Sequence, residues 1–387
     1  MTPPPQLPLH GLRVLDLTRV LAGPYCTMLL ADLGAEVVKI ERPGSGDDSR
    51  EFGPFMENGD SAYFASINRG KKSVVLDLKQ ESDRQTCLRL VEKADVLVEN
   101  FRPGTMESFG LSSERLRGVN PRLIVASATG FGQTGPDSRR AAYDVIIQAL
   151  SGLMSITGYD VSQPARVGNS ISDILTGLFT ALAIVSALRQ RDATGTGCDL
   201  DLSMLECTVA TLENAVTRFA VSGQPPGPLG TRHPSIAPFQ AFQAADGQFV
   251  IAAGNETLWR RLCEVLAAPE LLDDPKLTTN RDRAANLDHL EACLNVRLSQ
   301  RPMREWLALL GAAGVPAAPI RHLGEVVADP HLQTRGIWHS VQNGDNPPLL
   351  TAGTPFVIDG HKPPLSHTWP KLGEHNETVL REWLGEG

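Results

Sequence analysis

A single carboxylate, Asp173, stands at the start of the most apolar stretch of the chain, beside Ser170 and Ser172. Apolar residues recur around it at helical spacing, at Ile171, Leu175, Leu178, Leu182 and Val185. The pattern predicts a helix that begins here with a hydroxyl cap and buries this apolar face. Asp173 would lie in the first turn, where the helix dipole favours its ionised form. Such a residue either only stabilises its helix or faces a bound substrate.

Gly177 follows Asp173 by one helical turn. A glycine inside a helix costs about 1 kcal/mol relative to alanine, so its presence needs a compensating reason. One hypothesis is that it leaves room beside the Asp173 carboxylate for a substrate atom. A lone first-turn aspartate is more often only a helix stabiliser, and the rest of the sequence must decide between the two interpretations.

Length and composition are those of a globular protein with 387 residues, 42% hydrophobic and 21% charged, with a net charge of −8. A single core stops growing below this length, so two domains are expected. The net charge is negative and the sequence has no cluster of consecutive basic residues, which argues against a nucleic-acid-binding protein. Any anionic ligand must therefore be held by local Arg and Lys side chains.

The six cysteines are scattered without a C-x-x-C pair, which is typical of reduced thiols in a cytosolic protein. The nine histidines show no metal-ligand spacing, so no metal site is expected. No apolar run approaches the 18 residues of a membrane span, and Met1–Pro5 has neither the basic nor the apolar region of a signal peptide. We therefore expect a cytoplasmic protein without a membrane span.

Apolar runs alternate with helical patterns along the first half of the chain. Strands are predicted at 12–17, 36–40, 73–78, 95–98 and 123–127, with helices at 25–33 and 80–92. This alternation predicts an α/β class, a Rossmann-like parallel sheet whose loops bind the ligand. The first turn reads Leu21-Ala22-Gly23-Pro24-Tyr25 and lacks G-x-G-x-x-G, which disfavours a nicotinamide dehydrogenase.

The pattern changes after the linker 225–230. Before it, a strand at 199–202 and a long helix at 203–221 are expected; after it, a hairpin at 239–244 and 248–253 precedes helices at 256–266, 281–298 and 303–313. We therefore predict a large domain over 1–224, a smaller α+β domain over 231–324, and a return of 325–387 to the large domain, with a helix near 377–384.

Several segments, in order along nearly the whole chain, resemble the class III CoA-transferases, the family of formyl-CoA transferase, carnitine CoA-transferase and α-methylacyl-CoA racemase. They are GLRVLDLTRVLAGP (11–24), DLGAEVVKIE (32–41), NRGKKS (68–73), VENFRPG (98–104) and LGEH (372–375). The resemblance implies an interlocked homodimer in which each subunit is an open ring threaded by the other. It places the active site between one large domain and the small domain of the partner.

The resemblance also implies that Asp173 is a covalent nucleophile that forms aspartyl anhydride and aspartyl-CoA intermediates. No cofactor is held permanently, and coenzyme A is substrate and product. The positions that match CoA contacts in formyl-CoA transferase are Val20, Leu21, Ala22, Arg42, Leu76, Asn100, Phe101 and Tyr143. Further candidate anion contacts are Arg69, Lys71, Lys72, Arg102, Arg139 and Arg140. Ser108 replaces an arginine of formyl-CoA transferase, so one phosphate contact is replaced or lost.

Racemases of the family carry a histidine before the aspartate that is Asp144 here, where this chain has Tyr143, a poor base at neutral pH. The segment 230–242 is similar to the subgroup that uses succinyl-CoA and acts on glutarate, hydroxymethylglutarate, itaconate or malate. Arg232 or His233 would bind the remote carboxylate of such an acid. An acyl-CoA racemase or epimerase, a non-catalytic CoA-binding protein and a nicotinamide dehydrogenase stay as alternatives.

Overall fold

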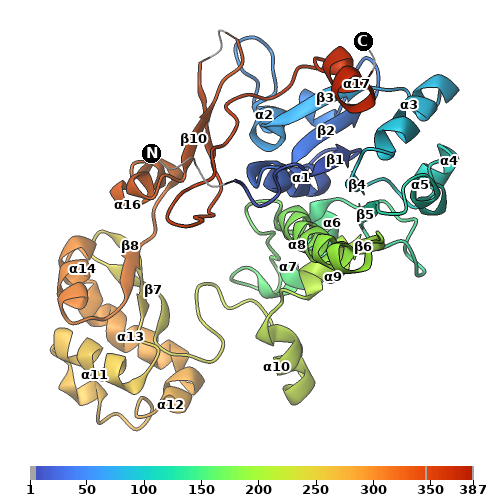
Figure 1. Cartoon of the computed structure of the whole chain (residues 1–387). Helices are drawn as coiled ribbons and strands as arrows, with labels where there is room; N and C mark the ends of the chain where they lie inside the picture. The colour runs from blue at the N-terminus through green and yellow to red at the C-terminus, as the bar shows by residue number, and fades with distance from the viewer. Residues whose placement is uncertain (1–5, 345–346, 386–387) are drawn as a thin grey trace. The chain divides into compact units, whose positions relative to one another are not determined.

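The computed structural model describes residues 6–344 and 347–385 (Figure 1). Residues 1–5, where no signal peptide is expected, lie outside this range. The chain forms two compact units, each described here by itself. The sheet unit contains residues up to 154, 166–223 and those from 330 onward, and the small unit contains 155–165 and 224–329. The sequence-based boundaries had assigned 155–165 to the large domain.

The sheet unit is built on a six-stranded sheet with the order β3-β2-β1-β4-β5-β6, in which every pair of neighbours is parallel. The strands are β1 (Arg13–Asp16), β2 (Glu36–Glu41), β3 (Lys71–Val75), β4 (Val96–Glu99), β5 (Ile124–Thr129) and β6 (Asp199–Ser203). The predicted α/β class with a parallel sheet is confirmed. The strand order reverses between β1 and β4, and open α/β sheets bind ligands at the carboxyl ends of the strands beside such a point.

Helices cover both faces of this sheet. The helices of the sheet unit are α1 (Ala22–Asp32), α2 (Ala62–Asn68), α3 (Glu81–Val91), α4 (Thr105–Ser108), α5 (Ser113–Val119), α6 (Asp144–Leu150), α8 (Ile171–Thr194), α9 (Met204–Val209), α10 (Asn214–Ser222), α16 (Pro330–Thr334) and α17 (Asn376–Leu384), with a 3-10 turn η1 (Asp48–Glu51). Because strand side chains alternate, Leu15 joins a core with α3 and α17. Its neighbour Val14 joins the opposite core with α1 and α8.

The Pro- and Gly-rich C-terminal part, for which the sequence predicted only the last helix, also contains α16 and a pair of strands. The strands β10 (Trp338–Val341) and β11 (Leu349–Ala352) pair in antiparallel fashion. Val341 and Trp369 pack with Phe64 and Ala65 of α2.

The small unit is an antiparallel sheet with helices packed against it. The sheet has the order β7-β8-β9, with β7 (Phe239–Ala244), β8 (Gly247–Ala252) and β9 (Ala317–Pro319). The helices are α11 (Glu256–Val265), α12 (Asn280–Ala285), α13 (Leu287–Leu298), α14 (Met303–Ala312) and α15 (Leu323–Val327), with η2 (Pro269–Leu271). Phe242, Phe249 and Trp259 centre its core. The short helix α7 (Leu153–Ile156) lies where the chain passes from one unit to the other.

Three predicted helices are wrong in extent. The expected helix at 203–221 is divided into α9 and α10, and Glu213 between them has a positive φ of 53°. The expected helix at 281–298 is divided at Asn286. Helix α1 begins at Ala22 rather than after Pro24, and a side chain at Gly23 would lie 2.4 Å from Cβ of Thr18. The glycine therefore permits the close approach that places Gly23 and Pro24 inside the helix.

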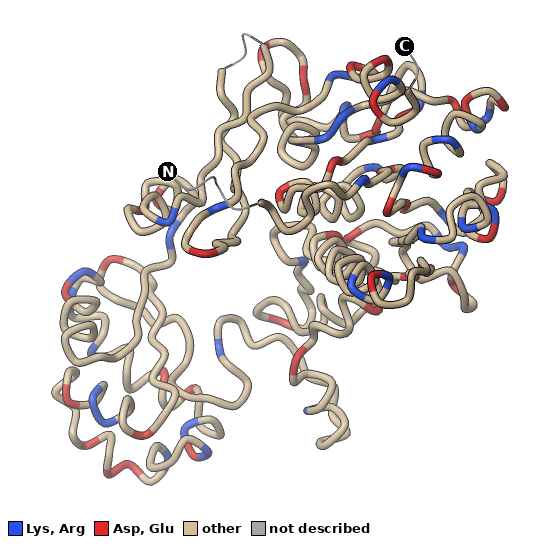
Figure 2. The backbone as a smooth tube through the Cα atoms, viewed as in Figure 1, with Lys and Arg blue, Asp and Glu red and all other residues tan. Residues whose placement is uncertain are grey.

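Helix α8 corrects two expectations. By length and composition it is apolar enough to cross a membrane, whereas no such run was expected from the sequence; Figure 2 shows few charges along it except near its C-terminal end. Ile184, Ala187 and Leu188 of α8 pack into one core with α1 and the sheet. The face predicted to be buried is instead exposed, with Leu178 43%, Leu182 62% and Val185 39% accessible.

Candidate active site

Asp173 lies in the first turn of α8, as predicted, but no hydroxyl caps this helix. Ser170 is the N-cap residue and its side chain makes no cap hydrogen bond. Instead, the backbone N–H of Ser172 donates to Oδ1 of the buried Asp144, at 2.8 Å. Asp144 also accepts from Nε2 of Gln148 at 2.7 Å. The cap therefore comes from the first residue of α6, 28 residues earlier, which no local pattern around Ser170 could indicate.

Gly177 is explained by helix packing rather than by room for a substrate atom. A Cβ added there would lie 2.8 Å from the carbonyl oxygen of Ala22, 3.0 Å from the Tyr25 ring and 3.2 Å from the backbone nitrogen of Cys26. Helix α1 thus crosses α8 within contact distance of the backbone. This approach brings the first residue of α1 to the nucleophile candidate, since the Ala22 N–H donates a hydrogen bond to the Asp173 carboxylate.

The ionisation of Asp173 is disfavoured, contrary to the expectation from its place in the helix. The pKa of Asp173 is raised to about 7, mainly by burial and also by the neighbouring charge of Asp144, while the hydrogen bond from Ala22 offsets only part of this rise. Burial in a protein interior outweighs the dipole of one helix end when a second carboxylate is close. A carboxylate with such a pKa is more basic than usual and ionises near neutral pH, which suits a nucleophile.

Tyr63 of α2 belongs to the same neighbourhood, and the sequence did not indicate it. Burial raises the pKa of Tyr63 to about 12, and the charges of Asp173, Asp47 and Asp144 contribute. Tyr63 is therefore a neutral phenol at neutral pH. Helix α2 has a serine N-cap, because the Ser61 hydroxyl accepts from the Phe64 N–H at 3.0 Å. A serine in this position is a sequence signal for the start of a helix. Tyr143, by contrast, is 71% exposed and directly precedes α6.

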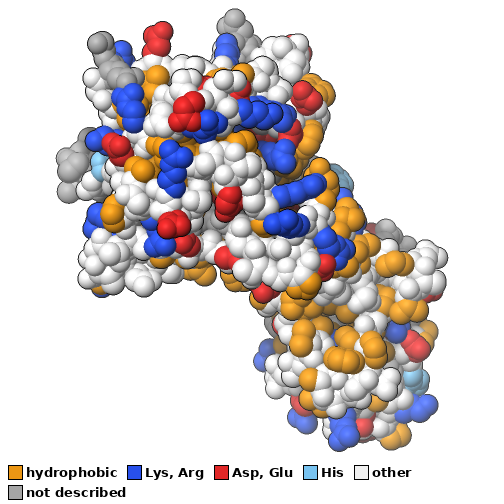
Figure 3. Space-filling model, turned by 90° about the vertical axis from the view of Figure 1, so that its right-hand side faces the viewer, with side chains coloured by type: hydrophobic (Ala, Val, Ile, Leu, Met, Phe, Trp, Pro, Cys, Tyr) orange, Lys and Arg blue, Asp and Glu red, His pale blue; other side chains and the backbone are white. Residues whose placement is uncertain are grey.

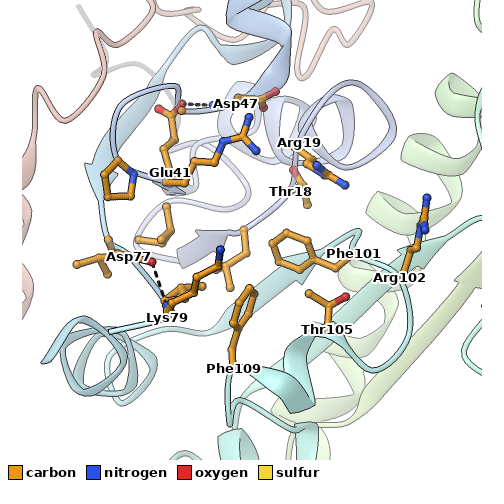
Figure 4. Close-up of a pocket in the computed structure, with 17 residues that line it drawn as sticks. Thr18, Arg19, Glu41, Asp47, Asp77, Lys79, Phe101, Arg102, Thr105 and Phe109 are labelled. Carbon is orange, nitrogen blue, oxygen red and sulfur yellow. Dashed lines mark hydrogen bonds between the residues drawn. The ribbon is translucent and has the colours of Figure 1, made fainter. Parts of the chain in front are cut away.

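A cavity of about 640 Å³ lies at the carboxyl ends of the strands around the switch point (Figure 4). Its apolar wall includes Ile40, Leu76, Leu78, Phe101 and Phe109, and its cationic side chains are Arg19, Arg42, Lys79 and Arg102. The rings of Phe101 and Phe109 meet edge to face with centroids 6.0 Å apart. Predicted contacts Arg42, Leu76, Phe101 and Arg102 all line this cavity, whereas Arg19 and Lys79 were not predicted.

The four cationic side chains of the cavity differ in whether they already pair with a carboxylate of the protein. Arg19 and Arg42 both pair with Asp48, the former at 2.9 Å. The side chains of Lys79 and Arg102 have no hydrogen-bond or ion-pair partner within residues 6–344 and 347–385. Figure 3 shows Lys and Arg side chains close together on one face of the sheet unit, although the whole chain is acidic. The cavity combines flat apolar walls with available positive charge, which suits an anionic nucleotide.

The loop after β1 joins this cavity to Asp173. Thr18 and Arg19 line the cavity, and Ala22 contacts Asp173. Val20, between them, has a positive φ of 68°, which is strained for a β-branched residue. The predicted contacts Val20, Leu21 and Ala22 therefore lie on one continuous path. The side-chain amide of Asn100 is used within the protein, since it accepts from the Arg19 N–H at 2.9 Å and donates to the Arg19 carbonyl at 2.8 Å.

Three further candidate anion contacts are engaged elsewhere, which corrects those predictions. Arg69 is buried and pairs with Asp32 at 2.7 Å. Lys71 is buried and pairs with Asp16 at 2.9 Å. Lys72 pairs with Glu36 and Glu382, at 2.7 and 2.6 Å. Arg140 pairs with Asp137 at 2.9 Å, and nothing in the structure assigns a role to Arg139.

The two predicted substrate contacts lie in the small unit, whereas Asp173 lies in the sheet unit. Arg232 pairs with Asp288 at 2.7 Å and with Glu291 at 2.5 Å. His233 Nδ1 accepts from the backbone N–H groups of Ser235 and Ile236, each at 3.1 Å. In the described part of the chain, no group of three or more His, Cys, Asp or Glu side chains is arranged to hold a metal ion.

Comparison with known proteins gives matches over nearly the whole chain. A family model described as CoA-transferase family III matches residues 9–376. The chain is 45% identical to an acetyl-CoA:oxalate CoA-transferase of Acetobacter aceti, over 98% of this chain and 96% of that protein. It is 40% identical to a succinate–glutarate CoA-transferase of Agrobacterium fabrum, over 97% and 95%. A crystal structure of a CAIB/BAIF family protein from Brucella suis has a TM-score of 0.86 and 39% identity, covering 98% of this chain and 100% of that chain.

Proposed function

Because the chain belongs to CoA-transferase family III and is a CoA-transferase, we propose that it moves CoA from an acyl-CoA to a small dicarboxylic acid through covalent intermediates on Asp173. The observation that carries this proposal is the setting of Asp173. Its carboxylate has a pKa raised to about 7 and accepts a hydrogen bond from Ala22. Ala22 in turn lies at the end of the loop that lines the cavity.

In the first half of the reaction, the ionised Asp173 carboxylate attacks the thioester carbonyl and the CoA thiolate leaves, giving a mixed anhydride. The thiolate then attacks the aspartyl carbonyl, which leaves an aspartyl-CoA thioester and frees the donor acid as its carboxylate. The acceptor carboxylate reverses these two steps and departs as its CoA ester. One negative charge enters and one leaves at each step. The Ala22 N–H and the neutral Tyr63 hydroxyl are the donors available to developing oxyanions.

The cavity would hold the nucleotide part of CoA, whose phosphates require cations. Lys79 and Arg102 are available for this without breaking an ion pair, whereas Arg19 and Arg42 share Asp48. Ser108 makes no phosphate contact of the arginine type, and its hydroxyl donates to the Thr105 carbonyl at 2.7 Å. Lys79 therefore supplies a cation in place of the missing arginine.

Replacing Lys79 by methionine should raise the KM for the acyl-CoA by about three- to tenfold and leave kcat nearly unchanged, because a phosphate contact is made equally in ground and transition states. Steady-state kinetics with varied acyl-CoA measure this. Lys93→Met removes a similar exposed lysine outside the cavity and serves as the matched control. A loss confined to kcat would contradict the assignment of Lys79 to phosphate binding.

The pH dependence follows from the environment of Asp173. Protonated Asp173 is not a nucleophile, so kcat/KM should rise with pH through an apparent pKa near 7. Asp144→Asn keeps an oxygen that can accept from the Ser172 N–H but removes the charge that raises the pKa of Asp173. The midpoint of its pH profile should therefore move to lower pH. An unchanged midpoint would show that Asp144 does not act on Asp173.

The donor is proposed to be succinyl-CoA, which releases succinate, and the acceptor is proposed to be a small dicarboxylate. The relative from Agrobacterium fabrum supports this pair, whereas the relative from Acetobacter aceti is named for acetyl-CoA and oxalate. A screen of both CoA esters against glutarate, hydroxymethylglutarate, itaconate, malate and oxalate distinguishes these cases. Oxalate and glutarate differ in the distance between their carboxylates, so their relative rates report the length of the acid site.

Arg232 is proposed to bind the remote carboxylate of the acid, with His233 as an alternative. Its ion pair with Asp288, which is 91% exposed at the side chain, can open at little cost, while Glu291 keeps the guanidinium group in place. Arg232→Ala should raise the KM for dicarboxylates more than the KM for monocarboxylates of similar length. Equal increases for both classes of acid would remove Arg232 from this role.

The chain is further proposed to act as a cytoplasmic homodimer, interlocked as in the family that it resembles. Apolar side chains remain exposed on α6, α8 and α10, namely Val145, Ile146, Leu150, Leu178, Leu182, Val185, Val216, Phe219 and Val221. A second copy of the chain would cover such a surface. Sedimentation at the mass of two chains is expected, and a monomer at micromolar concentration would refute the dimer.

The experiment that tests the proposed function is mass spectrometry of the intact protein after incubation with succinyl-CoA and trapping with hydroxylamine or borohydride. An adduct that maps to Asp173 is expected. Failure to form any adduct, together with exchange of the α-proton in D₂O without an acceptor acid, would instead favour the racemase alternative. The exposed Tyr143 in place of a histidine argues against that alternative.

A further inference from the structure

Two buried ion pairs lie directly beneath the loop that follows β1, and the proposed reaction uses neither. Lys39 and Asp47 pair at 2.8 Å, and Lys71 and Asp16 pair at 2.9 Å. All four side chains are almost fully buried. Buried ion pairs are weak devices for stability, because desolvation consumes much of their attraction. Stability alone therefore does not explain why two such ion pairs lie beneath a strained loop.

The Lys39–Asp47 pair holds the loop by its backbone. Nζ of Lys39 donates to the Thr18 carbonyl at 2.6 Å. Oδ1 of Asp47 accepts from the Val20 N–H at 3.0 Å, while its other carboxylate oxygen faces Lys39. Each charged group thus bonds its ionic partner and one backbone group of the loop. The pair connects two loop positions on either side of Arg19.

The Asp16–Lys71 pair fixes both ends of the same segment. Asp16 accepts from the Thr18 N–H at 2.9 Å, and Lys71 donates to the Pro24 carbonyl at 3.0 Å in the first turn of α1. Asn100 holds Arg19 from the side of β4. Backbone groups from Thr18 to Pro24 are therefore bonded by side chains from β1, β2 and β3, from Asn100 directly after β4, and from the loop after β2.

This set of contacts surrounds the strained residue. Val20 has a φ of 68°, in the left-handed region that a β-branched side chain rarely adopts. Such a conformation persists only where the surroundings determine it. Two residues later, the Ala22 N–H donates to Asp173. The loop conformation thus decides where this donor points.

We propose that the Lys39–Asp47 ion pair is a positioning device, which holds Val20 in its left-handed conformation and so aims the Ala22 N–H at the Asp173 carboxylate. Lys39 and Asp47 are positioning residues, and the inference rests on the proposed function of Asp173 as the nucleophile. The device needs both groups charged. Although burial opposes ionisation of each, Asp16, Asp47 and Glu41 raise the pKa of Lys39, and Lys39 lowers the pKa of Asp47.

The test replaces both partners at once, as Lys39→Met with Asp47→Leu. This double variant keeps the net charge and fills the space with apolar side chains, so folding should be retained. The Thr18 carbonyl and the Val20 N–H lose their partners, and the rate of Asp173 adduct formation in a single turnover should fall at least about tenfold. The acid limb of the pH profile should move to higher pH, because the hydrogen bond that lowers the pKa of Asp173 is weakened.

A role in folding alone predicts a different outcome. A folded double variant that forms the adduct within about twofold of the wild-type rate, with an unchanged pH profile, would overturn the inference. If the double variant does not fold, Asp47→Asn is measured instead, since it keeps an oxygen for Val20 and loses only the charge. An unchanged pH profile in that variant would equally overturn it. Absence of any adduct in the wild-type enzyme would instead refute the proposed function of Asp173. Failure of the proposed function and failure of this inference therefore give different results.

Discussion

Replacing Asp173 by asparagine should lower the rate of CoA transfer by at least about a hundredfold and abolish the trapped adduct, because an amide cannot take the place of an ionised carboxylate as nucleophile. The folded structure should survive this change. Asparagine has nearly the same shape and can still accept from the Ala22 N–H. Transfer assays and adduct mapping measure the first expectation, and retention of more than about one hundredth of the activity would contradict the covalent mechanism.

The same variant should be more stable than the wild type, and the difference should depend on pH. The pKa of Asp173 is about 7 in the folded state and 3.8 when unperturbed. Below about pH 4 the carboxyl is neutral in both states and Asp173 costs no stability. As the pH rises towards 7 the unfolded state gains from ionisation while the folded state does not, so the penalty grows and levels off above 7. Its upper limit is about 4 kcal/mol.

Thermal unfolding of Asp173→Asn and wild type at pH 4, 5.5 and 8 measures this difference. The two melting temperatures should converge at the lowest pH, and asparagine should gain most at pH 8. A variant less stable than the wild type at pH 8 would show that the folded protein does not disfavour the charge on Asp173. Functional sites commonly carry such a cost, because a reactive group is kept where its ionised form is poorly solvated.

The sheet and its ligand edge were predictable because their signals are local. Val14-Leu15, Val37-Val38 and Val96-Leu97 are short buried runs, and the helices between them force parallel pairing. The residues just after such strands must then gather at one edge, and Arg42, Leu76, Phe101 and Arg102 line the cavity there. The strand pattern predicts this edge, whereas the choice of Arg42, Leu76 and Phe101 came from the resemblance to formyl-CoA transferase.

The immediate surroundings of Asp173 were not predictable, because they depend on contacts distant in sequence. Asp144 caps α8 from another helix, and burial together with the charge of Asp144 reverses the expected direction of the pKa shift of Asp173. Lys71 and Lys72 show the same limit. Side chains of neighbouring strand residues point to opposite faces, and Lys71 is buried on Asp16 while Lys72 reaches Glu36 and Glu382. Two adjacent lysines in the sequence gave no sign of which would be buried.

Replacing Gly177 by alanine should destabilise the sheet unit, although alanine favours helix formation by about 1 kcal/mol. The added Cβ would lie 2.8 Å from the Ala22 carbonyl and 3.2 Å from the Cys26 nitrogen. Both are backbone atoms of α1, so the helices must separate, and overpacking of this kind costs about 1–3 kcal/mol. Since Ala22 also donates to Asp173, the separation should lower the rate of adduct formation as well.

The matched control is Gly118→Ala in α5, an exposed helical glycine of the same unit whose added Cβ meets nothing within 4 Å. It should be neutral or gain up to about 1 kcal/mol in urea unfolding. Comparing the two variants separates the two explanations of Gly177. Loss of both stability and adduct formation in Gly177→Ala alone supports close packing of α1 on α8. A Gly177→Ala variant as stable as Gly118→Ala but slow in adduct formation would instead show that the glycine leaves room for the substrate, because the new methyl group would then obstruct only the bound molecule.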